Sequence, residues 1–276
     1  MARVERVALP RQRGLTGVSD LAHAAGDGDL YYAIPERFHA LISLRVPAGP
    51  LAPVVQQLTP LEGIPDGLDT ESLAALGGGR FVAGTESTGS DRKTDAVFFI
   101  ELQGDHARAT RRLDVPWTAW GESVRAEENR GIEALCAVEG ALWIAGEFVR
   151  VEQGSRVAPL GRVDPETGAV TPFRLRLTSP TGKIAALTCR RSPSGTVEAI
   201  AVERHYGVAR LLRFPLPTGP QPDPITPDLA LDLAPLLPDL PNFEGIAFDG
   251  DDHVLLVSDN QMAIEVGPTW VVRARL

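Results

Sequence analysis

The sequence predicts an all-β fold, a five-bladed β-propeller built from four-stranded antiparallel blades. Three observations predict it. A short pattern recurs five times along the chain, each copy is followed by the same order of turns and strands, and the last copy ends before its fourth strand. An alternating segment at the N-terminus supplies that missing strand, so the two ends of the chain are expected to close the ring.

The recurring pattern is a short apolar strand opened by a polar or small residue. It begins at Ser19, Glu71, Glu133, Ala185 and Glu244, at intervals of 52 to 62 residues. A period of this length is typical of propellers, solenoids and repeat arrays. When the last interval is counted from Glu244 through Leu276 and on to Ser19, the five intervals together cover the whole chain. We therefore expect a single propeller domain over residues 1–276.

Each unit contains the same elements in the same order. The first strands are expected at residues 19–22, 71–74, 133–136, 185–188 and 244–247. After a turn rich in Gly and Asp, the second strands follow at 30–34, 80–83, 142–145, 197–202 and 254–257. The third strands are expected at 40–44, 96–100, 160–163, 209–214 and 269–273. A weaker fourth strand, such as 54–58, completes four units, and residues 4–9 complete the last. Six blades are the alternative if residues 106–129 contain another one.

The composition argues against some classes of partner. The chain has 36 acidic and 27 basic residues, a formal net charge of −9, which disfavours a surface for nucleic acid or for an anionic membrane. The N-terminal segment has no continuous apolar run, and no stretch reaches membrane-spanning length, so we expect a cytoplasmic protein. A small molecule is the expected partner, and the oligomeric state stays open.

The two cysteines, Cys136 and Cys189, each lie inside an apolar strand. Two cysteines make neither a zinc-binding pattern nor a disulfide framework. We therefore expect two inert buried thiols, in keeping with the frequent burial of free cysteine.

Acidic residues recur at the strand ends. The residue that closes the second strand is acidic in all five units: Glu36, Glu86, Glu147, Glu203 and Asp259. The residue that opens the first strand is acidic in three units: Glu71, Glu133 and Glu244. Because the two strands are antiparallel neighbours, these carboxylates are expected at one mouth of the central channel. Regular occurrence in every unit suits a structural role, whereas the three that break the repeat favour a functional role.

Carboxylates held so close repel one another unless cations lie among them. A divalent metal ion, with Ca²⁺ as the expected one, meets this need because it prefers six to eight oxygen ligands. The predicted ligands are Glu71, Glu133, Glu244, Asn242, Asp259 and Asn260. Asp69, Ser19 and Asn129 are further oxygen donors nearby.

Other residues near the same mouth are candidates for contact with a substrate. The candidates for substrate binding are Arg130, Lys183, Arg204, Glu36, Glu86 and Glu203, of which the three basic residues suit an anionic group. Glu147 or His205 is the candidate general base, since a histidine pKa lies near neutrality. The sequence contains no nucleophile elbow, Walker loop, dinucleotide fingerprint or His-Glu-x-x-His motif.

Three motifs carry a resemblance to a known family. They are residues 69–74, residues 129–135, and the pair 242–247 and 255–260, which reads Asn-Phe-Glu-Gly-Ile-Ala followed by Leu-Leu-Val-Ser-Asp-Asn. In these motifs the chain resembles the bacterial "esterase-like activity of phytase" family. The resemblance implies a β-propeller and hydrolysis of an ester or phosphoester. A more distant similarity is to calcium-dependent propeller lactonases, which hold a metal ion in the channel with Glu, Asp and Asn.

The leading functional hypothesis is therefore a metal-dependent hydrolase of an ester, lactone or phosphoester, acting at the channel mouth. Two alternatives stay open. One is a non-catalytic propeller that binds a ligand or partner on the same acidic face. The other is a metal-free cyclase or isomerase that uses carboxylates as acids and bases.

Overall fold

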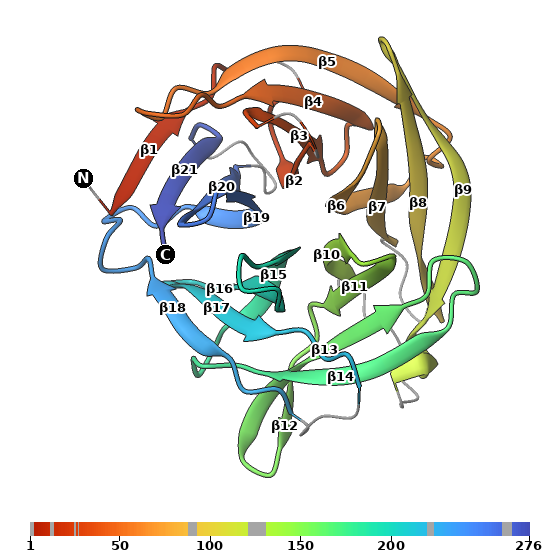
Figure 1. The fold of residues 1–276 in the computed structure, drawn as a ribbon, viewed down its shortest axis with the longest axis vertical. Helices are drawn as coiled ribbons and strands as arrows, with labels where there is room; N and C mark the ends of the chain where they lie inside the picture. Colours follow the sequence, from red (N-terminus) through yellow and green to blue (C-terminus); the bar gives the residue numbers. More distant parts are fainter. Residues whose placement is uncertain are drawn as a thin grey trace.

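The chain folds into a ring of antiparallel β-sheets whose innermost strands surround a central axis (Figure 1). The computed structural model describes residues 3–11, 14–24, 26, 28–87, 93–120, 131–219, 224–260 and 267–276. Apart from one short 3₁₀ helix, η1 (Trp117–Trp120), the regular elements of this part of the chain are β-strands. The predicted all-β propeller is confirmed.

The strand pairings follow the sequence units. The first unit contains β2 (Val18–His23), β3 (Leu30–Pro35), β4 (Ala40–Arg45) and β5 (Val54–Glu62). The second contains β6 (Leu68–Gly77), β7 (Arg80–Ser87), β8 (Thr94–Gln103) and β9 (His106–Pro116). Each unit is an antiparallel meander, and a short parallel pairing between β5 and β9 joins the two sheets. Residues 106–116, considered above for a sixth blade, thus form the outer strand of the second unit.

The next two units have the same plan. The third contains β10 (Ile132–Val138), β11 (Ala141–Gly146), β13 (Ser155–Val163) and β14 (Val170–Arg176), with β12 (Arg150–Glu152) as a short addition paired to β13. The fourth contains β15 (Lys183–Arg191), β16 (Val197–His205), β17 (Val208–Pro215) and β18 (Asp228–Asp232).

The N-terminal strand closes the ring, as the sequence predicts. The last unit supplies β19 (Asn242–Asp249), β20 (His253–Asp259) and β21 (Trp270–Arg275), and its outer strand is β1 (Val4–Ala8). The two termini pair antiparallel, with Val4 opposite Ala274 and Ala8 opposite Trp270. This pairing covers an edge of β21 that would otherwise expose unpaired backbone groups.

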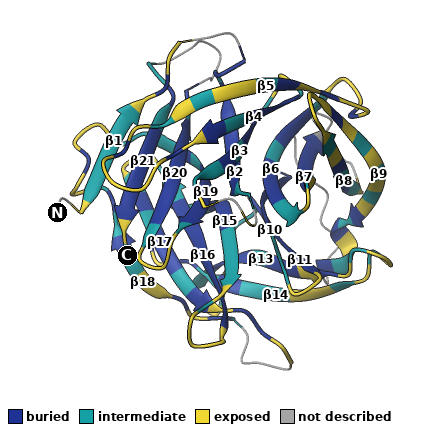
Figure 2. Ribbon diagram, turned by 45° about the horizontal axis from the view of Figure 1, so that its top comes forward, coloured by how far each residue is buried: buried dark blue, intermediate teal, exposed yellow. Residues whose placement is uncertain are grey.

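The core consists of apolar layers between consecutive units. Trp143 and Leu160 of the third unit pack with Leu187 and Phe214 of the fourth. A similar apolar cluster lies between the two units of every other neighbouring pair. The layer that joins the last unit to the first completes the circle. Exposed positions gather on turns and outer strands such as β5 and β9 (Figure 2). The inner strands are therefore held in place from both sides by burial.

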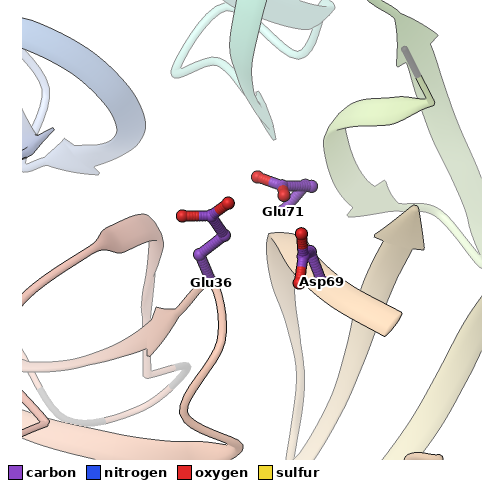
Figure 3. A group of neighbouring side chains, drawn as sticks. All are labelled: Glu36, Asp69 and Glu71. Carbon is purple, nitrogen blue, oxygen red and sulfur yellow. The ribbon is translucent and has the colours of Figure 1, made fainter. Parts of the chain in front are cut away.

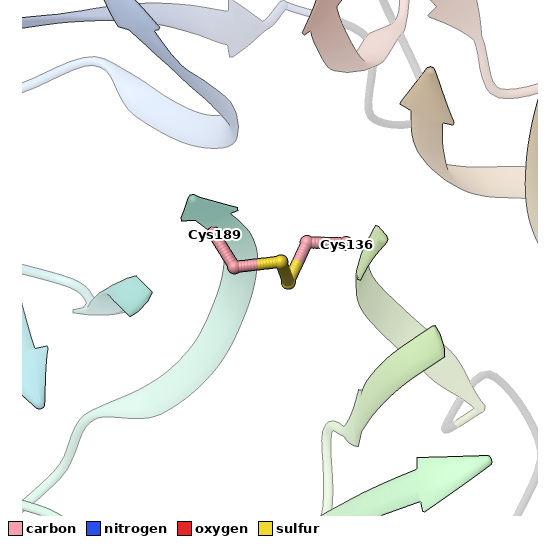
Figure 4. Close-up of a disulfide and its surroundings, with 2 residues drawn as sticks. All are labelled: Cys136 and Cys189. Atoms are coloured by element: carbon pink, nitrogen blue, oxygen red, sulfur yellow. A yellow bond between two sulfur atoms is a disulfide. The ribbon is translucent and has the colours of Figure 1, made fainter. Parts of the chain in front are cut away.

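The two cysteines form a disulfide, so the expectation of separate thiols is wrong. Cys136 in β10 and Cys189 in β15 lie with their Cα atoms 5.7 Å apart, within the usual range for this bond (Figure 4). The cysteines occupy similar places in the inner strands of two consecutive units, and consecutive units are neighbours in the ring. A count of cysteines ignores this adjacency, which the repeat itself contains.

A close backbone approach makes Gly245 necessary in β19. A Cβ atom added there would lie 2.6 Å from the Cα of Asp20 and 2.9 Å from the backbone nitrogen of Leu21. Gly245→Ala is expected to lower the free energy of unfolding by about 1–3 kcal/mol through overpacking. Urea denaturation measures this loss. Gly28→Ala is the control because its added Cβ meets no atom within 4 Å, and equal stability of the two variants would contradict the close approach.

The described residues contain no helix that is long and apolar enough to cross a lipid bilayer.

Candidate functional site

A β-bulge interrupts the start of each innermost strand. The register of the inner pairings skips one residue in every unit: Ser19, Glu71, Glu133, Ala185 and Glu244. A bulged residue has no partner of its own on the adjacent strand, and the bulge re-aims its side chain. The positions selected by the sequence repeat are thus the places where each unit redirects a side chain at one end of the ring of inner strands, the end that is called the mouth below.

The pairing beside each bulge defines a second position at the same mouth. Two residues before the bulge, each inner strand faces the end of the second strand: Gly17–Glu36, Asp69–Glu86, Gly131–Glu147, Lys183–Arg204 and Asn242–Asp259. Four units place an acid at the end of the second strand. The fourth unit places Arg204 there and Lys183 opposite it. This unit therefore brings two cations to a mouth that the others line with carboxylates.

Glu203 lies one residue away from this position, so its assignment to the acidic ring is wrong. Its side chain is fully buried. It accepts hydrogen bonds from the backbone amides and hydroxyl groups of Thr178 and Ser179, at 2.6 to 3.0 Å. These bonds hold the segment that leads into β15. A carboxylate satisfied by four donors has a structural role and is not directed at a ligand.

Glu36, Asp69 and Glu71 form a compact group of carboxylates at the mouth (Figure 3). One carboxylate oxygen from each residue lies within 4.8 Å of those of the others. Glu71 is the bulged residue of β6, and Asp69 lies two residues before it on the same strand. Glu36 directly follows β3 of the neighbouring unit. The guanidinium of Arg37 approaches this group, with Nη2 3.2 Å from Glu36 Oε1 and Nε 3.8 Å from Asp69 Oδ2.

The group is electrostatically costly in the absence of a bound cation. Burial raises the pKa of Glu71 well above the usual value, and the nearby Glu133, Glu86 and Glu36 raise it further. Burial also raises the pKa of Glu36 and that of Asp69, although the charge of Arg37 opposes both shifts. The Oδ2 atom of Asp69 is buried and accepts no hydrogen bond from the described residues. The cluster thus favours either bound protons or a bound cation.

Glu133 extends the acidic surface into the third unit. Only 7% of its surface is exposed. Burial raises its pKa well above the usual range, the charges of Glu86 and Glu244 add to the shift, and Lys183 and Arg204 oppose it. A buried carboxyl group with a raised pKa is suited to proton transfer near neutral pH.

The fourth unit adds two cations beside these carboxylates, Lys183 and Arg204. Arg204 makes a two-point ion pair with Glu244, with Nε 3.0 Å from Oε2 and Nη2 in contact with Oε1. Asn242 donates from Nδ2 to the same carboxylate at 2.8 Å, and Lys183 pairs with the buried Glu147. Burial opposes the charge of Arg204, but the nearby carboxylates outweigh it and raise its pKa. Glu244 and Glu147, predicted as metal ligand and base, are therefore ion-pair partners in this structure.

Asn260 does not join the site. Its Oδ1 accepts from the amide of Gly17 at 3.0 Å, and its Nδ2 donates to the carbonyl of Gly267 at 2.9 Å. The side chain therefore ties β20 to the start of the first unit, and its prediction as a metal ligand is replaced by this structural role. Asp259 lies at the mouth, close enough for its charge to help raise the pKa of Arg204.

The two remaining candidates add little to the cluster. The ring of His205 packs edge-on against the exposed Tyr206, with ring centroids 5.1 Å apart, near the β16–β17 turn. Among the described contacts, none joins this imidazole to the carboxylates. Arg130, together with Asn129, lies outside the described residues.

Asp20 is a buried acid without a counterpart in the other units, and the repeat pattern assigns it no role. This acid sits inside β2, and only 1% of its surface is exposed. It accepts backbone hydrogen bonds from three strands. The sequence signal was an acid in an apolar inner strand, directly after the opening residue, where the other units have Ser72, Ala134, Ala186 and Gly245.

Comparisons with known proteins agree with this architecture. The model of a family described as "Phytase-like: Esterase-like activity of phytase" matches residues 13–262. No curated protein matches the chain. The chain is similar to the PQQ-bound aldose sugar dehydrogenase of Streptomyces coelicolor (TM-score 0.52, 12% identity, 99% of both chains covered). It is also similar to an exo-β-1,3-galactanase of Phanerochaete chrysosporium (TM-score 0.56, 11% identity, 99% of this chain and 64% of that chain). Identities this low show a shared fold alone.

Proposed function

The chain belongs to the family described as "Phytase-like: Esterase-like activity of phytase", and we propose that it is a metal-dependent hydrolase of an ester, lactone or phosphoester. The proposed site is the channel mouth, and the proposed metal is a divalent cation, with Ca²⁺ favoured by the all-oxygen donor set. One observation carries the proposal: Glu36, Asp69 and Glu71 bring carboxylate oxygens within 4.8 Å of one another. Of the ligands expected from the sequence, only Glu71 is retained in this set. Glu36 and Asp69 take the place of the others.

The three carboxylates fit a hard divalent cation. Ca²⁺ accepts carboxylates through one or both oxygens, so three of them supply roughly three to six of its six to eight ligands and leave room for water and substrate. The buried Oδ2 of Asp69, which accepts no hydrogen bond from the described residues, would gain a partner. Arg37, whose side chain is 55% exposed, is free to move into solvent when the cation enters.

The other charged groups at the mouth would take two roles, proton transfer and the binding of an anionic group of the substrate. A divalent cation supplies polarisation of a carbonyl or phosphoryl oxygen and lowers the pKa of bound water. Glu133, buried beside the cluster with a raised pKa, is our candidate for the proton transfer, in place of Glu147 and His205. Lys183 and Arg204 would hold the anionic part of a substrate or of its transition state, exchanging their present carboxylate partners for it.

A metal-free acid–base enzyme is the second candidate. Its support is the same buried Glu133, whose pKa stands well above the usual range beside Lys183 and Arg204. Such an enzyme would use the protonated carboxyl group as an acid in a cyclisation or isomerisation. The raised pKa is common to both candidates, so the cation is what separates them.

The test compares chelated protein with protein supplied with Ca²⁺. We expect Ca²⁺ to raise the Tm and to support hydrolysis of p-nitrophenyl acetate, p-nitrophenyl phosphate or γ-butyrolactone. At a concentration 100 times the Kd, binding linkage stabilises the fold by about 2.7 kcal/mol. Unchanged Tm with turnover of a probe would favour the metal-free enzyme, and unchanged Tm without turnover would favour a ligand-binding propeller.

A further inference from the structure

Asp20 links the inner strands of three units through its carboxylate. Its Oδ1 accepts from the amide of Leu21 in β2 at 2.8 Å and from the amide of Ile246 in β19 at 3.2 Å. Its Oδ2 accepts from the amide of Leu73 in β6 at 2.8 Å. The side chain is nearly inaccessible, with 1% of its surface exposed. Both oxygens are therefore committed to backbone donors from the first, second and last units.

These amides lie just beyond the bulges. Leu73 follows Glu71 by two residues, and Ile246 follows Glu244 by two residues. The strands β6 and β19 are end strands of their sheets, so the amides on their inner edges have no strand to pair with. Asp20 supplies the missing acceptor and fixes the backbone at the point where each strand leaves its bulge.

The arrangement belongs to the first unit alone among the repeats. The equivalent positions hold serine, alanine or glycine, none of which offers two acceptor oxygens. The close approach of β19 to β2 at Gly245, described above, brings the amide of Ile246 within reach of Asp20. The local backbone is thus arranged around this one carboxylate.

We propose that Asp20 is a positioning residue for the channel mouth, which holds the bulges of β6 and β19 so that Glu71 and Glu244 face the site. The proposal rests on the proposed function, because Glu71 is a proposed cation ligand and Glu244 anchors Arg204. Asp20 itself touches neither the cation nor the substrate. It acts through the backbone, as outer-shell groups act on metal ligands.

The test uses Asp20→Asn and measures Ca²⁺ affinity by calorimetry. The amide NH₂ group would face the N–H of Leu73 or of Ile246, so one bond between units becomes a contact between two donors. We expect the Kd for Ca²⁺ to rise by about 10-fold to 100-fold, the usual cost of losing an outer-shell partner. An unchanged Kd would overturn the proposal.

Asp249→Asn is the matched control. Asp249 lies at the other end of β19, accepts from the hydroxyl of Tyr31 in the first unit at 3.0 Å and pairs with Arg273 at 2.5 Å. It also joins the last unit to the first, but away from the mouth. Both variants are expected to lower the Tm, and only Asp20→Asn is expected to weaken Ca²⁺ binding. An equal loss of affinity in both would reduce Asp20 to a general stabilising role and overturn the proposal.

Crystal structures of the cation-free wild type and of Asp20→Asn keep the proposal separate from the proposed function. We expect the carboxylates of Glu71 and Glu244 to move or to lose their single orientation in the variant. If the wild type binds no Ca²⁺, the proposed hydrolase fails, and these structures still decide the role of Asp20. Both carboxylates in their wild-type positions would overturn it. If Asp20→Asn does not fold, Asp20→Ser, which carries the residue found at Ser72, is measured in the same ways.

Discussion

Glu71→Gln is expected to abolish the response to Ca²⁺ and, in the same protein, to raise the stability of the chelated form. The loss of a ligand should weaken Ca²⁺ binding by more than about 100-fold, the upper cost of losing an outer-shell group. The gain arises because burial, and then the nearby charges of Glu133, Glu86 and Glu36, hold the pKa of Glu71 well above the usual value, so that its charged form is destabilised. A neutral amide of similar shape removes that repulsion.

The pH dependence of unfolding is an independent test of whether the charge of Glu71 destabilises the chelated protein. A carboxyl group whose pKa is higher in the folded than in the unfolded protein binds its proton more tightly in the folded state. The chelated wild type is therefore expected to gain stability as the pH falls through the raised pKa of Glu71 towards the ordinary carboxyl pKa near 4.3, where this contribution is complete. Glu71→Gln should show a smaller gain, and saturating Ca²⁺ should reduce the gain of the wild type over the same range, leaving the part that comes from groups outside the ligand set such as Glu133.

Thermal unfolding with and without chelator measures both effects. Glu101→Gln is the control, since Glu101 is an exposed acid in β8 and belongs to no part of the mouth. It should leave the Ca²⁺ response and the stability of the chelated protein unchanged. A Glu71→Gln protein that still gains stability from Ca²⁺ would contradict its role as a ligand. A chelated variant less stable than the wild type would contradict the electrostatic explanation.

Loss of the Cys136–Cys189 disulfide is expected to have the second large effect. The bond closes a loop with a sequence separation of 53 residues. In the chain-entropy description, the restriction of the unfolded chain by a loop of this length stabilises the fold by about 4 kcal/mol. Replacement of both cysteines by serine should lower the free energy of unfolding by about 2–4 kcal/mol, the range typical of measured disulfides.

Urea denaturation with and without dithiothreitol measures this contribution. Reductant should destabilise the wild type to the level of the double serine variant and leave that variant unchanged, which makes the variant its own control. A thiol titration of the unfolded wild type should find free thiols only after the protein has been reduced. Free thiols before reduction, or equal stability of the two proteins, would contradict the bond.

The sequence was sufficient to predict the fold because a propeller repeats its design along the chain. The spacing of Ser19, Glu71, Glu133, Ala185 and Glu244 predicted the inner strands, and all five turned out to be the bulged residues. The N-terminal strand was predictable because the last unit lacks its own outer strand. Both predictions can be made without side-chain geometry, since they depend only on the order of the strands and on the spacing of the repeat.

The site was less predictable because it depends on register and on contacts between units. Strand composition cannot distinguish Glu203 from Arg204 as the residue at the channel mouth, since a shift of one residue reverses the direction of every side chain. The pairing of Glu244 with Arg204, and the approach of Glu36 to Asp69, depend on the distance between neighbouring units. Asp20 was overlooked because its partners are backbone amides far away in the sequence.

The proposed cation site is tested most directly by a high-resolution crystal structure of the protein grown with Ca²⁺. We expect a spherical density peak bound by carboxylate oxygens of Glu36, Asp69 and Glu71 at about 2.3–2.6 Å, with Arg37 turned towards solvent. A mouth without such a peak, in which Arg37 still lies between Glu36 and Asp69, would contradict the proposed site.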